Sequence, residues 1–200
     1  GKPFRYLAIA PTICKVSDNF NIRVKGEDLW GNPSDQCSET FFLKSDVEIN
    51  NLPEAITLNK GDFTFIIKDL FVSKSSYSYV KFYDKRGNLR FQTNPFRIED
   101  DPDCKYFWAD LHGQSEETIG TGSAEQYFRF ARDFAFIDAV GHQGNDFQIS
   151  NDFWAELDNL CEKFDLENEF VAIPGYEWSG NTSLGGDRNV FFSYKRQEDS

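Results

Sequence analysis

Several features are missing from this chain of 200 residues, and each absence excludes a class of protein. It contains no run of roughly 18 apolar residues, the length that a membrane-spanning helix requires. It does not open with a basic segment followed by an apolar stretch, so no signal peptide is visible. Methionine is also absent and the chain begins at Gly1, from which we expect a processed or excised piece of a longer protein. The cellular compartment is therefore left open.

Closely paired cysteines are missing as well. The four cysteines, Cys14, Cys37, Cys104 and Cys161, include no C-x-x-C pair, which argues against a zinc knuckle. Cys14 and Cys37 would form a disulfide if the protein is exported, or both would remain free, buried thiols. The sequence leaves both alternatives open.

Positive charge is scarce in only one half of the chain. Residues 1–105 carry 15 Lys/Arg and 15 Asp/Glu, whereas residues 106–200 carry 6 Lys/Arg and 18 Asp/Glu, a net charge of −12. This imbalance argues against nucleic acid as a partner, because phosphate backbones are bound by Lys and Arg. Such a shift in composition indicates a domain boundary. We place it in the polar segment 98–103, which gives domains 1–103 and 104–200.

The first domain has the pattern of a β-rich module. Short runs of β-branched and aromatic residues are separated by turn formers, among them Asp28-Leu29-Trp30-Gly31-Asn32-Pro33 and Asp84-Lys85-Arg86-Gly87-Asn88. About seven such runs in roughly 100 residues predict an immunoglobulin-like sandwich. The turns resemble those of bacterial immunoglobulin-like modules of the invasin or filamin type. We interpret this half as structural or substrate-orienting. If it binds a partner itself, exposed Trp30 would stack on a sugar or a peptide.

The second domain alternates predicted strands with predicted helices. Apolar runs at 106–109, 134–140, 170–173 and 189–194 predict strands, and a capping box at Ser123 and a helical period over 151–164 predict two helices. This alternation is typical of a parallel sheet with crossover helices. In such sheets, functional groups gather at the carboxyl ends of the strands.

Only two histidines occur in the chain, and each directly follows one of these predicted strands. His112 and His142 therefore lie at carboxyl ends, as does Glu177 after the third strand, and we expect the three side chains to converge. Asp110 lies two residues before His112 and faces the same way on a strand, and Gln114 extends this row. Imidazole and carboxylate together suit Zn, Mn or Fe. A water bound to such a metal has its pKa lowered to about 7 and can act as a hydroxide nucleophile.

Other interpretations of the same residues remain open. A single histidine at a strand end is more often a hydrogen-bonded structural residue than a metal ligand. Asp138 would be a ligand, a partner of a ligand or a helix-capping acid, and Asp146 is interpreted as a loop or capping residue. The segment 185–189 would bring Asp187 and Arg188 to the site, or would form an ordinary turn that enters a strand.

Four segments carry a resemblance that none of them carries alone: ADLHGQS at 109–115, AVGHQGND at 139–146, PGYEWSG at 174–180 and GDRNVFF at 186–192. Together they resemble the PHP (polymerase and histidinol phosphatase) superfamily of metal-dependent phosphoesterases, most closely an uncharacterised bacterial branch known as a domain of unknown function. The resemblance implies a distorted (β/α)7 barrel with metal ions at its carboxyl-end face. It implies that His112 and His142 are ligands and that Glu177 bridges two ions.

The chain also departs from the pattern of that superfamily. Gln114 stands where the second histidine of a His-x-His is expected, and Gly141 replaces an aspartate before His142. A further histidine of the family, expected in the segment around residues 187–189, has no counterpart in this chain. In that segment we take Asp187 as the ligand. The closing strands and later ligands would lie beyond residue 200, because about 95 residues cannot close a barrel that needs ~200.

From these patterns we expect an immunoglobulin-like sandwich followed by part of a PHP-like barrel. The expected function is metal-assisted hydrolysis of an anionic small molecule, with a phosphoester as first choice. The expected ligands of one to three Zn, Mn or Fe ions are Asp110, His112, Gln114, His142, Glu177 and Asp187, with Glu177 also taking a proton from water and Arg188 binding the substrate. One alternative is a non-catalytic surface or binding module that relies on residues 1–103. Another is an amidohydrolase-type enzyme that acts on amides or lactones. The oligomeric state is left open.

Overall fold

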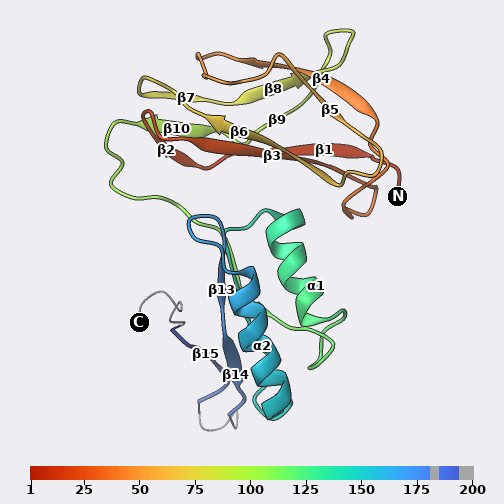
Figure 1. Ribbon diagram of the computed structural model, residues 1–200, viewed down its shortest axis with the longest axis vertical. Helices are drawn as coiled ribbons and strands as arrows, with labels where there is room; N and C mark the ends of the chain where they lie inside the picture. Colours follow the sequence, from red (N-terminus) through yellow and green to blue (C-terminus); the bar gives the residue numbers. More distant parts are fainter. Residues whose placement is uncertain (181–184, 194–200) are drawn as a thin grey trace. The chain divides into compact units, whose positions relative to one another are not determined.

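The computed structural model describes residues 1–180 and 185–193 (Figure 1). Its contacts divide the chain into two compact units, Gly1–Tyr106 and Phe107–Ser200. We call them unit 1 and unit 2 and describe each by itself. None of the helices in the described part of the chain has the length and apolar character that a membrane crossing demands.

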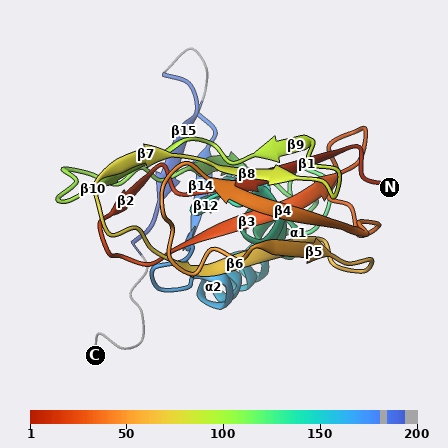
Figure 2. The same cartoon turned by 90° about the horizontal axis from the view of Figure 1, so that it is seen from above.

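Unit 1, all of which is described, consists of ten strands in three sheets. The strands are β1 (Arg5–Ile9), β2 (Ile13–Lys15), β3 (Phe20–Glu27), β4 (Glu39–Ser45), β5 (Ala55–Leu58), β6 (Thr64–Leu70), β7 (Ser76–Ser78), β8 (Val80–Tyr83), β9 (Leu89–Gln92) and β10 (Phe96–Glu99). The sheets β1-β3-β6 and β5-β4-β8-β9 are antiparallel, whereas β2 pairs with β10 in parallel. Seen from above, most strands of unit 1 run along the length of the unit (Figure 2).

The core of unit 1 lies between these sheets. Side chains alternate along a strand with a period of two, so Phe20 and Ile22 of β3 are buried whereas Asn21 between them is exposed. The rings of Tyr6 from β1 and Phe41 from β4 lie 4.8 Å apart in an edge-to-face arrangement. Aromatic packing of this kind joins the two layers and makes unit 1 a β-sandwich.

The described part of unit 2 contains five strands and two α-helices. They are β11 (Ala109–Gly113), α1 (Ala124–Arg129), which continues into a π-helical turn η1 (Phe130–Ala135), β12 (Ala139–His142), α2 (Asn151–Phe164), β13 (Val171–Ile173), β14 (Gly175–Trp178) and β15 (Arg188–Phe191). Strands β11, β12 and β13 form a parallel sheet in that order. Strands β14 and β15 form a separate antiparallel pair.

Serine side chains determine where both helices of unit 2 begin. The Ser123 hydroxyl accepts the N–H of Gln126, and the Gln126 side chain accepts the N–H of Ser123, so the predicted capping box is present. The Ser150 hydroxyl accepts the N–H of Phe153 and caps α2 in the same manner.

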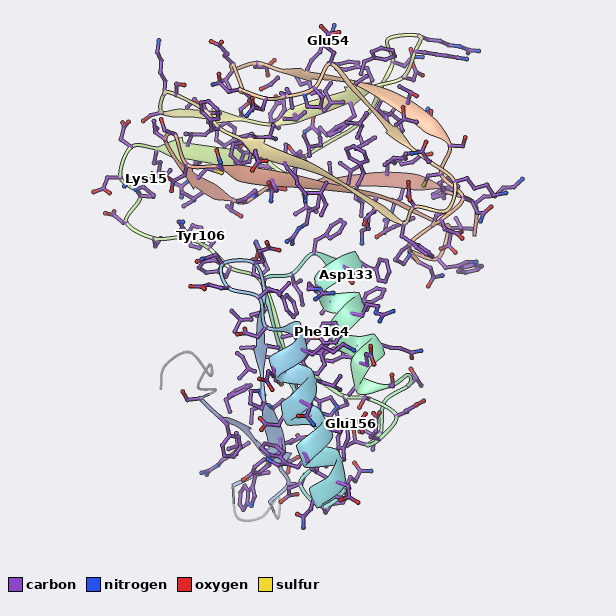
Figure 3. The ribbon with its side chains drawn as sticks, viewed as in Figure 1. Lys15, Glu54, Tyr106, Asp133, Glu156 and Phe164 are labelled. Atoms are coloured by element: carbon purple, nitrogen blue, oxygen red, sulfur yellow. The ribbon has the colours of Figure 1, made fainter. Side chains whose placement is uncertain are left out.

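Both helices pack on the same face of the parallel sheet. Val140 of β12 and Ala172 of β13 are buried in one cluster with Phe128 of α1 and Phe164 of α2. The rings of Phe128 and Phe164 are stacked with their centroids 5.7 Å apart. Figure 3 labels Phe164 on α2 among the side chains of unit 2. This shared cluster fixes the helices against the sheet and leaves its other face to different neighbours.

The expected fold class, a sandwich followed by part of a (β/α)7 barrel, is wrong because of its second half, since unit 1 is a sandwich but unit 2 is not part of such a barrel. Within its described residues, unit 2 has only three parallel strands, and the next strand, β14, pairs with β15 in antiparallel fashion. An antiparallel pair does not continue the parallel strand order of a barrel. The predicted strand at 134–140 is also largely absent, because η1 occupies 130–135 and β12 begins only at Ala139. Between them, Phe136 adopts a left-handed φ of 61° that ends the helical turn.

Candidate functional site

Three polar side chains from different strands of unit 2 meet at one place. His112 comes from β11, Glu177 from β14 and Asn189 from β15, where Glu177 and Asn189 are cross-strand partners. The Nδ1 atom of His112 lies 2.9 Å from Oδ1 of Asn189, and its Nε2 atom lies 3.8 Å from Oε2 of Glu177. Two of the three side chains that the sequence predicts to converge, those of His112 and Glu177, thus lie side by side.

Asn189 determines which nitrogen of His112 carries the proton. Its Nδ2 donates to the carbonyl oxygen of Leu111 at 3.3 Å, so the atom that faces His112 is Oδ1, which can only accept. In the neutral ring the proton is therefore on Nδ1, and the lone pair of Nε2 faces the Glu177 carboxylate. Two facing acceptors favour a donor group between them. The His112–Glu177 pair can therefore bind a hydrogen-bond donor.

Amide side chains hold the Glu177 carboxylate in place. Its Oε2 atom accepts Nδ2 of Asn145 at 2.8 Å and Nε2 of Gln114 at 3.4 Å, and its side chain is only 12% exposed. Asn145 also contacts the hydroxyl of Ser179 at 3.0 Å. Gln114, a predicted metal ligand, is thus a donor to Glu177. Asn145 is not among the predicted site residues, and its only signal in the sequence is its place in the polar run after His142.

His142, the other predicted imidazole ligand, is fully buried inside unit 2. Its Nδ1 accepts the N–H of Gly144 at 3.3 Å, so Nε2 carries the proton and donates to the Ser115 hydroxyl at 2.7 Å. Ser115 is in turn hydrogen-bonded to Glu117. Burial lowers the pKa of His142 to about 4, and the nearby Glu117 charge only partly opposes this. Both ring nitrogens are used within the fold, which gives His142 a structural role.

Two further aspartates considered from the sequence stabilise the start of the parallel sheet. Asp110 accepts the N–H of His112 at 3.2 Å and is hydrogen-bonded to Tyr127. Burial, and then the Asp110 charge, raise the pKa of Tyr127 well above its usual value. Asp138 accepts the N–H of Trp108 at 2.8 Å. Both carboxylates therefore make local contacts that order β11 and β12.

Arg188 and Asp187 lie at the beginning of β15. The Arg188 guanidinium is 5.9 Å from the centroid of the Trp178 ring. Because side chains alternate along a strand, Arg188 points to the opposite side of β15 from Asn189, and so away from His112. Asp187 is exposed directly before the strand, and within the described residues it is not a partner of Glu177. The structure thus does not bring these two predicted residues to the polar group.

The residues that the structure describes contain no group of three or more His, Cys, Asp or Glu side chains that could hold a metal ion. The prediction of a metal site in this part of the chain is therefore wrong, whereas hydrolysis as the function of the protein is not tested and stays a prediction. The physical reason is that the amides of Gln114, Asn145 and Asn189 occupy the surroundings of Glu177 and His112. Amides are poorer ligands than imidazole or carboxylate for Zn, Mn or Fe. A cofactor of that kind elsewhere in the protein stays a prediction.

A second feature with functional potential is a hairpin turn that ends β3 in unit 1. The Oδ1 atom of Asp28 accepts the N–H groups of Trp30 and Asn32, both at 2.9 Å. The N–H of Gly31 donates to the carbonyl oxygen of Asp28 at 3.1 Å, and Gly31 has a φ of 85°. Glycine adopts this left-handed conformation without a steric penalty. Three hydrogen bonds to one aspartate thus fix the conformation of the turn.

The turn between β8 and β9 is built in the same way. The Oδ1 atom of Asp84 accepts the N–H groups of Arg86 at 2.8 Å and Asn88 at 2.9 Å. The N–H of Gly87 donates to the Asp84 carbonyl oxygen at 2.9 Å, and Gly87 has a φ of 82°. The same sandwich therefore displays two turns with equivalent backbones.

The tips of the two turns differ in chemistry. The first carries Leu29 and Trp30, which are 63% and 83% exposed. The second carries Lys85 and Arg86 at the corresponding positions. Phe4, whose N–H donates to the residue before Asp28, is 70% exposed at the same end of the sheet. Because the second turn has charged residues at its tip, this backbone does not require apolar ones.

The polar atoms of the first turn are used within the turn itself. Both carboxylate oxygens of Asp28 accept from the Asn32 side chain at 3.2 Å, and the amino group of Gly1 lies 3.6 Å from Oδ2. Desolvation acts to raise the pKa of Asp28, but hydrogen bonds from Asn32 and Trp30 hold it below its usual value. What the turn offers to a partner is therefore mainly the apolar surface of Leu29 and Trp30.

Comparison with known proteins gives one relative in sequence. No protein-family model matches the chain. An uncharacterised protein of Chlamydia pneumoniae is 22% identical over 194 residues, which are 95% of this chain and 31% of that protein. The chain thus spans about a third of the length of this relative.

Two solved structures show a distant similarity in fold. The D0-D1 domain of intimin has a TM-score of 0.35 and 9% identity, with 46% of each chain covered. The fibronectin type III domain of human fibronectin type III domain containing protein 3 has a TM-score of 0.22 and 17% identity, with 50% of this chain and 90% of that chain covered. These values carry no argument about function, and the assignment of a sandwich rests on the strand pairing of unit 1.

The expected membership in the PHP superfamily is wrong. No protein-family model matches the chain. The described part of unit 2 also lacks the barrel and the metal cluster that the resemblance implies. The four matching segments fold into short strands and loops whose polar side chains bond mainly to one another.

Proposed function

We propose that this chain is a binding module and that the turn of Leu29 and Trp30 in unit 1 contacts a partner protein. The observation that carries the proposal is the difference between two turns of equivalent backbone. The turn at Asp84 shows that charged tip residues are compatible with the fold. Exposing Leu29 and Trp30 to water therefore has no structural reason, and an exposed apolar patch on a sandwich typically marks a contact surface.

The chemistry of the turn favours a protein over a glycan as the partner. Sugar recognition combines an aromatic ring with free hydrogen-bonding groups, but those of Asp28 and Asn32 are already used. Arg5 borders the turn, because a Cβ atom on Gly31 would lie 3.7 Å from its guanidinium. Exposed Trp and Arg side chains with apolar neighbours are typical of the residues that contribute most to protein–protein affinity.

The decisive experiment exchanges the tip residues of one turn for those of the other. The double variant Leu29→Lys, Trp30→Arg carries at its tip the residue types that the second turn has there. It is expected to fold normally. A partner captured by the native chain, then purified, is expected to bind this variant at least about tenfold more weakly in surface plasmon resonance. The matched control Lys85→Ala, Arg86→Ala is expected to bind as the native chain does.

The same measurement separates this proposal from metal-dependent activity. Binding through Leu29 and Trp30 is expected to be unchanged by a chelator, because no metal takes part in the contact. Binding that persists in the double variant, or that disappears on chelation, would contradict the proposal. Hydrolysis of a small molecule by the complete protein is not tested by the fold and stays a prediction.

A further inference from the structure

The Glu177 carboxylate in unit 2 is largely buried, and it forms no ion pair with a lysine or arginine among the described residues. Its side chain is 12% exposed. Asn145 and Gln114 donate N–H groups to it, but their amides carry no charge. The neighbouring ring of His112 is charged only if it binds a second proton. A buried charge without an opposite charge is costly, so the site favours a cation from outside the chain.

The cations of unit 2 are engaged at other places. Glu125, which is 40% exposed, lies 2.9 Å from the ammonium of Lys163 and 3.2 Å from the guanidinium of Arg129. Arg188 belongs to the same hairpin as Glu177, but its guanidinium lies over a tryptophan ring. The more exposed carboxylate of the two is thus paired twice, whereas the more buried one has only neutral donors.

The ring of His112 directs a lone pair at the same place. Asn189 accepts from Nδ1, so in the neutral ring Nε2 carries the lone pair and faces Oε2 of Glu177. These two atoms are 3.8 Å apart, which is too long for a direct hydrogen bond. A donor nitrogen can lie about 2.8 Å from each of two atoms at this separation. The His112 side chain is 52% exposed, so a solute can reach this position.

The two acceptors determine which kind of cation suits the site. An ammonium group carries three N–H donors around one positive charge, and two of them can point to Nε2 and Oε2. A guanidinium binds a carboxylate best through both oxygens side by side, whereas two amide donors already occupy Oε2. A hydroxyl leaves the charge of Glu177 unbalanced. Zn, Mn or Fe would need further imidazole or carboxylate ligands, which the described residues do not bring together.

We propose that His112 and Glu177 form a binding site for a primary ammonium group, carried by a small amine or by a lysine side chain. Its N–H groups donate to the imidazole Nε2 and to the carboxylate Oε2, and its charge balances that of Glu177. The rest of the ligand extends into solvent past the exposed ring. This site belongs to unit 2 and does not depend on the turn of Leu29 and Trp30.

The test follows the ring nitrogens of both histidines in the whole chain by long-range ¹H–¹⁵N spectra at about pH 7, where a primary amine is protonated. Tetramethylammonium chloride, which has a positive charge but no N–H donor, is replaced stepwise by ethylammonium chloride at constant total concentration. A chelator is present throughout, so that no metal ion takes part. We expect a saturable shift of the Nε2 resonance of His112 and no shift for His142, whose ring is buried and bonded within the fold.

Two carboxylate-to-amide variants form a matched pair, because each removes one negative charge from the same region. Glu177→Gln removes the charged partner of the ammonium, whereas Asp187→Asn changes an exposed side chain directly before β15. We expect Glu177→Gln to weaken ethylammonium binding at least about tenfold and Asp187→Asn to leave it within about twofold of the native value. The His142 resonances report on folding and are expected to be unchanged in both variants.

A third variant tests the imidazole. Asn189→Ala removes the acceptor that keeps the proton of His112 on Nδ1, and a ring with its proton on Nε2 cannot accept from an ammonium there. We expect ethylammonium binding to weaken at least about threefold although Glu177 is intact. Unchanged His142 resonances in this variant would show that the loss does not come from unfolding.

Lysine with blocked α-amino and carboxyl groups distinguishes the two sources of the ammonium group. Half-saturation at a lower concentration than ethylammonium would support a lysine of a protein or peptide as the ligand. Half-saturation at the same or a higher concentration would support a small amine.

Three results would overturn the proposal. The first is the absence of a saturable His112 shift with both ammonium compounds. The second is native binding in Glu177→Gln. The third is an equal loss in Glu177→Gln and Asp187→Asn, which would assign the shift to the general negative charge of unit 2.

Discussion

Asp28 and Asp84 hold two separate turns of the sandwich in the same conformation, each by accepting N–H groups from the residues two and four positions later. The two turns share three residue types at equivalent positions, namely the aspartate, a glycine with positive φ and an asparagine. The two residues at the tip take no part in these hydrogen bonds through their side chains. The conformation of the turn therefore does not depend on the side chains at the tip, and these side chains are available to contact a partner.

The first prediction concerns the glycine of the functional turn. Gly31→Ala is expected to lower the free energy of unfolding by about 1 kcal/mol, because an alanine at a φ of 85° is strained. Urea denaturation checks this value. The strain also displaces the tip, so binding of the partner protein through Trp30 is expected to weaken.

Gly87→Ala is the matched control for that prediction, because Gly87 has a φ of 82° in the equivalent turn. It is expected to lower stability by a similar amount while leaving partner binding unchanged. Equal losses of binding in both variants would show that the effect comes from stability alone and not from the position of Trp30.

The second prediction concerns the protons of the two histidines. In their neutral forms, His112 is expected to carry its proton on Nδ1 and His142 on Nε2, because Asn189 accepts from one ring and Gly144 donates to the other. Long-range ¹H–¹⁵N spectra distinguish the two tautomers, and only two imidazoles occur in the chain. Asn189→Ala is expected to shift the ring of His112 toward the other tautomer and to leave His142 unchanged. Identical tautomers in the native chain would refute the hydrogen-bond assignment.

The local pattern of the sequence predicts much of the secondary structure. Serine at 123 and at 150 begins the two helices because hydroxyls satisfy free N–H groups at a helix start. Turn formers such as those at 28–32 and 84–88 lie between strands for the reasons given above. The strand predicted at 134–140 fails because the apolar pattern does not reveal the π-helical turn or the left-handed Phe136.

The candidate site shows what local patterns leave undetermined. Placing residues at strand ends correctly predicts that His112 and Glu177 lie in reach of each other. It does not predict the direction of His142, which depends on the long-range contact between Ser115 and the buried ring. It also does not predict the hairpin of β14 and β15, since strand direction is set by pairing partners rather than by composition. The prediction of a barrel is wrong because β14 pairs with β15 in antiparallel fashion.

The third prediction follows from the buried ring of His142. Its pKa of about 4 in the folded chain lies below the ordinary value of about 6.5. As the pH falls through this range, the unfolded chain takes up a proton that the folded chain excludes, so the free energy of unfolding decreases, by at most about 3 kcal/mol. Burial acts to raise the pKa of Glu117, but hydrogen bonds from Ser115 and Ala124 lower it, so its contribution disappears at still lower pH.

Urea denaturation at about pH 7 and about pH 5 tests this prediction. His142→Gln is expected to be less stable at neutral pH but to lose less stability on acidification, because its side chain does not titrate. Ile119→Ala changes an exposed side chain that has no titratable group, and it serves as the control with a pH dependence close to that of the native chain. An unchanged pH dependence in His142→Gln would assign the effect to other groups.

The fourth prediction concerns the space between β11 and α1. A Cβ atom at Gly113 would overlap the ring of Tyr127, whose hydroxyl donates to the Gly141 carbonyl oxygen at 3.4 Å. Gly113→Ala is therefore expected to lower the free energy of unfolding by about 1–3 kcal/mol through overpacking. Tyr127→Leu removes the ring that causes the overlap, so the double variant is expected to lose less stability than the two single variants together. Urea denaturation of all four proteins measures this coupling. Strictly additive losses would mean that the backbone of β11 moves away from the ring, and then the adjacent His112 would also lose its position beside Glu177.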